Sequence, residues 1–122
     1  MTKPNIEIKW LDEPEDHDYP AALSYLTLVG NHQYARYTVE ALKDAPVIKF
    51  KAKDIFRASK LSLLGVSNSH VKKDRKKILR GEALSPLLLV RHGNDLVIGD
   101  GYHRLCSVYS FDEDAVIPCK LV

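Results

Sequence analysis

The chain has 122 residues, of which 45% are hydrophobic and 28% charged, enough for one domain with a single core and too few for two independent domains. Its 18 basic and 16 acidic residues give a formal net charge of +2, and this near balance argues against a nucleic-acid-binding protein. No apolar run approaches the roughly 18–20 residues of a membrane span and no signal-peptide core is present, so we expect a cytoplasmic protein with no membrane partner.

The first elements along the chain are a short strand and a helix. Residues 6–10 alternate like a strand, and the acidic stretch 12–16 is expected to be a loop. Asp18 is expected to cap a helix that runs to about Val29, because Pro20 would then fall in its first turn.

A second helix is predicted from about Tyr34 to Asp44. We interpret 1–45 as an N-terminal helical appendage packed on a core formed by 46–122, the whole being one globular domain. The tyrosines of the two helices are interpreted as packing residues rather than a stacking platform for bases. These helices are also the natural interface for a protein partner or a homodimer.

The core begins with a half-buried strand at 47–51 and a brief helix at 53–57. A further helix is expected from Ser69 to Arg80, with Gly81 as its C-cap. This helix carries the only local excess of basic residues, at 72–77. The run is interpreted as a solvated face, and a nucleic-acid footprint is the less favoured alternative.

The last third of the chain predicts a hairpin, a helix and a strand. The apolar runs 87–90 and 96–98 form the hairpin across a short glycine turn, and a helix follows from about Tyr102 to Phe111. The final strand covers 116–121, where Pro118 indicates an edge or strand-start position. These elements predict an α+β fold.

The most informative stretch is Gly99 to Arg104, where a strand, a glycine turn and a helix start meet. Such a junction leaves the N–H groups of the first helical turn without partners in the helix, and it places His103 and Arg104 beside them. Two interpretations remain open and can coexist. In one, Asp100 caps the helix and pairs with Arg104; in the other, the N–H groups and cations hold a ligand phosphate.

The two cysteines, Cys106 and Cys119, lie among apolar residues and show no spacing typical of zinc. We therefore expect buried, reduced thiols and no metal site.

These motifs together resemble the ParB/sulfiredoxin superfamily over about residues 46–122. The segment from Ala22 to Val29 and the chain end also resemble a widespread group of its small bacterial members. The resemblance is carried by Arg80-Gly81, the strand from Pro86 to Val90, the turn Asp100-Gly101-Tyr102-His103-Arg104 and the closing Ile117-Pro118-Cys119-Lys120-Leu121-Val122. The turn is nearest to the Asp-Gly-His-His-Arg of the superfamily's free-serine kinases. The resemblance implies a small mixed sheet with flanking helices, here preceded by the helical pair.

The resemblance also implies a nucleotide ligand, ATP or another nucleoside triphosphate with Mg²⁺. The matching residues of sulfiredoxin contact nucleotide phosphates, which implies the same role for Gly101, His103 and Arg104. Arg57 would be a second phosphate ligand, and Lys72 or Lys76 on the next helix would reach the nucleotide. For these last three residues, an ordinary surface charge is the alternative.

The chain departs from sulfiredoxin at one decisive position. Tyr102 stands where sulfiredoxin has its nucleophilic cysteine, and a phenol with a pKa of about 10 cannot replace a thiolate. Cys106 lies a helical turn too far along, about 6 Å, to take over that role. The Gly-Glu-Arg-Arg turn of ParB-like domains is also missing.

Three functions are therefore weighed. The first is a small nucleotide-dependent phosphotransferase or hydrolase, in which Asp100, His103 and Arg104 act in catalysis. Asp54 is a further candidate base or metal contact, with the N-cap of a short helix as its alternative role. The second is a nucleotide-responsive binding module without enzymatic activity. The third and least favoured is a nucleic-acid binder or nuclease.

Overall fold

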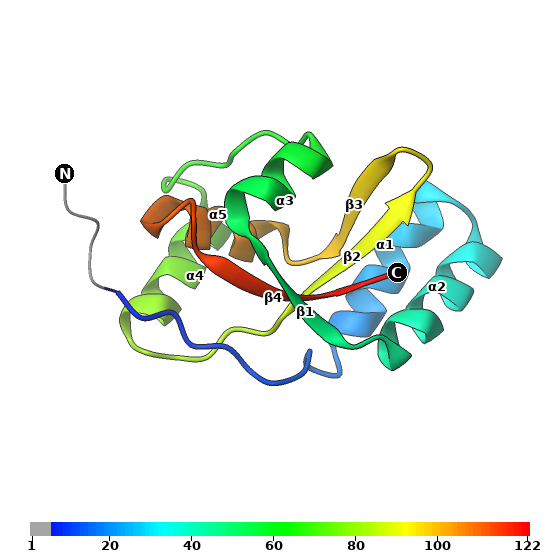
Figure 1. The fold of residues 1–122 in the computed structure, drawn as a ribbon, viewed down its shortest axis with the longest axis horizontal. Coiled ribbons are helices and arrows are strands. Elements are labelled where there is room, and N and C mark those ends of the chain that lie inside the picture. Colours follow the sequence, from blue (N-terminus) through cyan, green and yellow to red (C-terminus); the bar gives the residue numbers. More distant parts are fainter. Residues whose placement is uncertain (1–5) are drawn as a thin grey trace.

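The computed structural model describes residues 6–122, so the first five residues of the predicted appendage lie outside the described part. Residues 6–122 form an α+β fold of five helices and four strands (Figure 1). In chain order they are α1 (Asp18–Val29), α2 (His32–Asp44), β1 (Val47–Lys51), α3 (Ala52–Ser59), α4 (Ser69–Leu79), β2 (Leu87–His92), β3 (Asp95–Asp100), α5 (Tyr102–Phe111) and β4 (Val116–Leu121).

The four strands form one mixed sheet in the order β1-β4-β2-β3. β2 and β4 are parallel, whereas the β1–β4 and β2–β3 pairs are antiparallel. The predicted hairpin is confirmed, with Gly93 at a φ of 62° in its turn.

The prediction that Pro118 marks an edge or a strand start is wrong, because β4 lies between β1 and β2. The pairing of β4 with β2 begins only at Cys119, so at Pro118 the strand has β1 as its single partner. A proline, which has no N–H to donate, is tolerated at a position where one side of the strand is unpaired.

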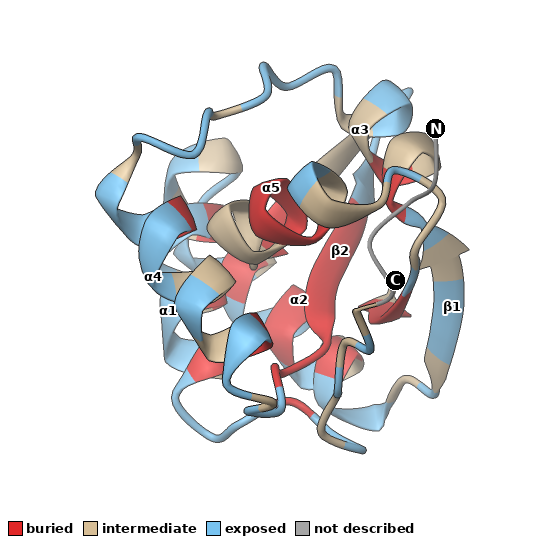
Figure 2. Cartoon of the chain, turned by 90° about the vertical axis from the view of Figure 1, so that its left-hand side faces the viewer, coloured by how far each residue is buried: buried red, intermediate tan, exposed pale blue. Residues whose placement is uncertain are grey.

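Alternate residues of β2 point to opposite faces of the sheet, and helices cover both faces. Leu88 and Val90 pack against Ala22 and Leu26 of α1 and against buried residues of α2. On the opposite face, residues of α3, α4 and α5 pack against β2 and β4. Figure 2 shows the result: β2 and the inner side of α5 are buried between exposed outer surfaces.

Two expectations for the N-terminal region are corrected. Residues 6–10 form no strand; Trp10 makes one parallel bridge to Leu84, supported by a 2.8 Å hydrogen bond from Leu11 N–H to Leu84 O. The pairing does not extend beyond this bridge, because Leu84 lies between α4 and β2 and is not part of a strand. The N-cap of α1 is His17, and Asp18 is the first helical residue.

Candidate functional site

The turn between β3 and α5 is built on Gly101. This residue is the N-cap of α5 with a φ of 111°, and within residues 6–122 no side chain caps the helix. A Cβ at this position would lie 2.7 Å from Leu87 Cγ and 2.9 Å from Arg104 Nη2, so only glycine fits. The expected capping role of Asp100 is wrong, because Asp100 precedes the cap. The first N–H groups of α5 therefore have no side-chain partner among the residues that the structure describes.

A pocket of about 160 Å³ lies in front of this helix start. Its lining comes from the turn and from α4, and comprises Asp100, Gly101, Tyr102, His103 and Arg104 together with His70, Lys73, Asp74 and Lys77. The four α4 residues follow the spacing of one helical face. Ser107 joins the two helices, since its hydroxyl oxygen lies 2.9 Å from both Val71 O and His103 O. We call this cavity the phosphate pocket, after the ligand group that we propose it binds.

The two histidines of the phosphate pocket lie against each other. The ring centroids of His70 and His103 are 4.7 Å apart, with an angle of 42° between the planes. Burial lowers the pKa of His103 below its ordinary 6.5, and the neighbouring His70 and Arg104 lower it further, against an opposing effect of Asp74. His103 is therefore neutral at pH 7 and becomes a cation only in more acidic solution.

Arg104 and Asp100, which both line the pocket, form an ion pair. Arg104 Nη2 lies 3.1 Å from Asp100 Oδ2 and donates a 3.5 Å hydrogen bond to Pro86 O. The two side chains are only 16% and 20% exposed, and the buried Arg104 Nε has no hydrogen-bond partner within the described residues. The predicted pairing of these residues is confirmed.

Asp18 of α1 is a third charged residue at this ion pair. It is 2% exposed, and its Oδ2 accepts a 3.0 Å hydrogen bond from Glu15 N–H. Burial raises the pKa of Asp100; Arg104 opposes this rise, and the charge and hydrogen bond of Asp18 add to it. Sequence reasoning missed this role, because the contact joins two residues far apart in the chain.

Tyr102 connects the phosphate pocket to the loop between α3 and α4. Its hydroxyl donates a hydrogen bond to Ser62 O, and burial raises the pKa of the phenol, with a smaller contribution from Cys106. Tyr102 is thus a neutral hydrogen-bond donor at pH 7.

The expectation of buried, reduced cysteines is confirmed, since Cys106 and Cys119 are both free and buried. Burial raises the pKa of the Cys106 thiol, and it raises that of Cys119 to about 12. A thiol held in its protonated form by burial is a poor nucleophile.

Three of the predicted nucleotide contacts lie outside the phosphate pocket. Arg57 lines a different cavity and forms a 2.7 Å ion pair with Asp54, which is itself on α3 after the N-cap Lys51. Lys72 and Lys76 are exposed on α4, and the lysines that line the pocket are Lys73 and Lys77. The buried Val71 and Ile78 mark the inward side of α4, but the two lysine pairs lie on opposite flanks of that side. The sequence therefore gives no signal for which pair faces the pocket.

Across residues 6–122, no group of three or more His, Cys, Asp or Glu side chains is arranged to hold a metal ion. In the same part of the chain, no helix has both the length and the apolar character needed to cross a membrane. Comparisons of the chain with protein-family models, with curated proteins and with solved structures find no match.

Proposed function

We propose that the phosphate pocket binds the phosphate groups of a nucleotide. The observation that carries this proposal is that the uncapped start of α5 faces Lys73 and Lys77 of α4 across the pocket. Free N–H groups and the helix dipole favour an anion at a helix N-terminus, and the two ammonium groups add mobile positive charge. His103 would strengthen the site by taking up a proton when an anion is bound.

The sequence resemblance supports a nucleotide as the source of the phosphate. We propose that the chain belongs to the ParB/sulfiredoxin superfamily, and the residues of sulfiredoxin that match Gly101, His103 and Arg104 contact nucleotide phosphates. The ligand would be ATP or another nucleoside triphosphate with Mg²⁺. A volume of about 160 Å³ equals that of about five water molecules. A cavity of this size has room for phosphate groups but not for a nucleoside as well, so the nucleoside would lie outside the pocket.

The geometry supports binding more directly than catalysis. Asp100, the candidate catalytic carboxylate, is engaged by Arg104 and lies next to Asp18. It becomes available to orient a water molecule or a hydroxyl acceptor only if Arg104 turns to the bound phosphate. A phosphotransferase or hydrolase therefore needs this exchange of partners, whereas a nucleotide-responsive binding module does not.

Thermal unfolding in the presence of ATP, ADP, CTP, GTP or tripolyphosphate, each with Mg²⁺, tests binding. A nucleotide at 100 times its Kd should stabilise the protein by about 2.7 kcal/mol. Absence of any shift with all five compounds would refute the proposal. Tripolyphosphate binding as tightly as ATP would show that the phosphates alone are recognised.

The lysines of α4 provide a matched pair of variants. Lys73→Gln/Lys77→Gln should weaken binding by about tenfold or more, and Lys72→Gln/Lys76→Gln, with the same change of net charge, by less than about twofold. Equal weakening by the two variants would mean that only the general charge of α4 matters, and would contradict a built pocket. Release of phosphate or ADP from bound ATP then separates an enzyme from a binding module.

A further inference from the structure

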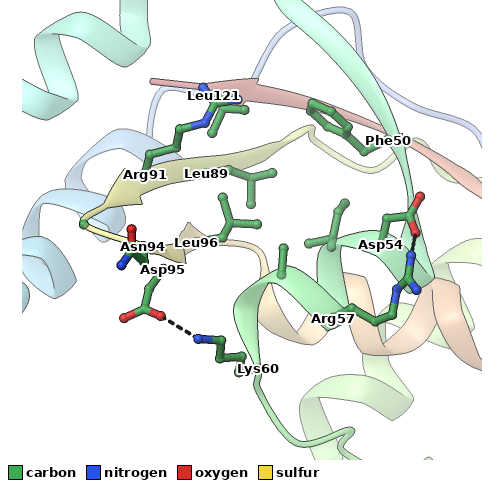
Figure 3. Close-up of a pocket in the computed structure, with 13 residues that line it drawn as sticks. Phe50, Asp54, Arg57, Lys60, Leu89, Arg91, Asn94, Asp95, Leu96 and Leu121 are labelled. Carbon is green, nitrogen blue, oxygen red and sulfur yellow. Dashed lines mark hydrogen bonds and ion pairs between the residues drawn. The ribbon is translucent and has the colours of Figure 1, made fainter.

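A second and larger cavity lies between α3 and the β2–β3 hairpin, and it shares no lining residue with the phosphate pocket (Figure 3). Its volume is about 470 Å³. Cavities that bind small organic molecules range from about 300 to 1,000 Å³. We call this cavity the sheet pocket.

The floor of the sheet pocket is apolar. Every strand contributes one side chain to it, namely Phe50 of β1, Leu89 of β2, Leu96 of β3 and Leu121 of β4. Ile55 and Ala58 of α3 form an apolar wall. The floor exists because α3 has only eight residues and leaves part of this face of the sheet uncovered. An apolar ligand body would remove this surface from water.

The rim of the sheet pocket is charged and contains an excess of cations. Asp54 pairs with Arg57 at 2.7 Å, and Lys60 pairs with Asp95 at 3.0 Å. Figure 3 shows these two ion pairs at the rim with the apolar side chains between them. Arg91 of β2 also lines the pocket, and within residues 6–122 its side chain has no ion-pair partner. The rim therefore offers one guanidinium that is free to bind an anion.

We propose that the sheet pocket binds a small amphipathic carboxylate, with its apolar body on the floor and its carboxylate on Arg91. The planar guanidinium matches a carboxylate in a two-point contact. A ligand with several negative charges fits less well, because the other two cations of the rim are already neutralised by Asp54 and Asp95. This site is separate from the phosphate pocket and does not depend on the function proposed for it.

Octanoate and 1-octanol are suitable probes, because they share an apolar chain and differ in the head group. Titration followed by amide chemical shifts should show octanoate binding about tenfold more tightly than 1-octanol, with shifts centred on Leu89, Leu96 and Leu121. Equal affinity for the two probes would overturn the role of Arg91. Absence of binding by both up to their solubility limits would overturn the site itself.

Two arginine variants isolate the head-group contact. Arg91→Gln should reduce octanoate affinity to that of 1-octanol and leave 1-octanol binding unchanged. Arg36→Gln makes the same chemical change at an exposed residue of α2 and should bind both probes like the wild type. An octanoate affinity unchanged by Arg91→Gln would refute the proposal, as would an equal loss in both variants.

The cavity is tested by filling it. Ala58→Trp, at an exposed position of α3, should abolish binding of both probes while the thermal unfolding curve stays cooperative. Persistent octanoate binding in this folded variant would show that the probe binds elsewhere. The Lys73→Gln/Lys77→Gln variant should keep full octanoate affinity, which distinguishes a failure of this site from a failure of the phosphate pocket.

Discussion

The phosphate pocket and the sheet pocket are built in opposite ways. The phosphate pocket, about 160 Å³, consists of one helix start and one face of a second helix, and polar groups line it. The sheet pocket, about 470 Å³, takes its floor from all four strands and has charges only at its rim. Under the two proposals, ligand affinity would depend on backbone N–H groups and cations in the first pocket, and on apolar surface and one guanidinium in the second.

This difference determines how each pocket responds to mutation. The phosphate pocket depends on backbone geometry at Gly101 and on a network of half-buried charges, so single substitutions there should change stability as well as binding. In the sheet pocket the proposed ligand-binding group, Arg91, lies on an exposed rim, so its substitution should alter binding without loss of stability.

The largest effect is expected from Gly101→Ala. The left-handed backbone and the approach of the new Cβ to Leu87 should together cost about 3 kcal/mol of unfolding free energy. Urea denaturation measures this loss, and Gly65→Ala is the control because a Cβ there meets nothing within 4 Å. If Gly101→Ala were as stable as the control, the tight turn at the start of α5 would be incorrect.

A smaller effect is expected from Asp18→Asn. Because the pKa of Asp100 is raised in the folded protein, its contribution to stability is complete below about pH 3.8 and is lost as the pH rises through the folded pKa. Replacing Asp18 removes the repulsion while keeping an oxygen that can accept from Glu15 N–H. The variant should gain about 1 kcal/mol near pH 7 and lose less stability with rising pH.

Urea denaturation between about pH 4 and pH 8 checks this prediction, with Asp16→Asn as an exposed neighbouring control. An unchanged pH profile in Asp18→Asn would mean that Asp18 does not act on Asp100. A loss of stability near pH 7 would mean that the Asp18 charge is needed by other partners, such as His17.

The pH dependence of sulfate binding should show the next smaller effect. Sulfate keeps its double charge over this range, whereas His103 takes up a proton only below its ordinary pKa of 6.5. Sulfate affinity should rise about fivefold from about pH 7.5 to pH 5.5. His103→Gln should remove most of this rise, whereas His32→Gln at the start of α2 should not. Equal profiles in the wild type and His103→Gln would exclude His103 from the site.

The features with local sequence signals were predicted well. The helix from Tyr102 to Phe111 and the β2–β3 hairpin follow from apolar patterning and from glycines at the turns, which depend on neighbouring residues alone. The turn from Asp100 to Arg104 was identified in the same way, because it is one continuous segment, and it lines a cavity in the structure. The phosphate ligand of that cavity stays a prediction.

Features that depend on the packing of distant segments were not predicted. The edge position expected from Pro118 was wrong, because the place of a strand in a sheet cannot be read from that strand alone. The role of Asp18 beside Asp100 was missed, because this contact joins two distant segments. The sheet pocket has no signal in the sequence, since its floor takes one residue from each strand. The lysines of α4 are an intermediate case. Their helix could be predicted from the sequence, but the sequence does not show which of its faces lies against the start of α5.

The smallest effect is expected from Arg57→Gln, and it tests whether the two pockets are separate. The resemblance assigned Arg57 to the nucleotide phosphates, but its side chain is 80% exposed and paired with Asp54 at the sheet pocket. Breaking such an exposed pair should change the unfolding free energy by less than about 0.5 kcal/mol. ATP affinity should change by less than about twofold. A tenfold loss of ATP affinity would instead show that Arg57 reaches the phosphates when ligand binds, and the two pockets would then be parts of one site.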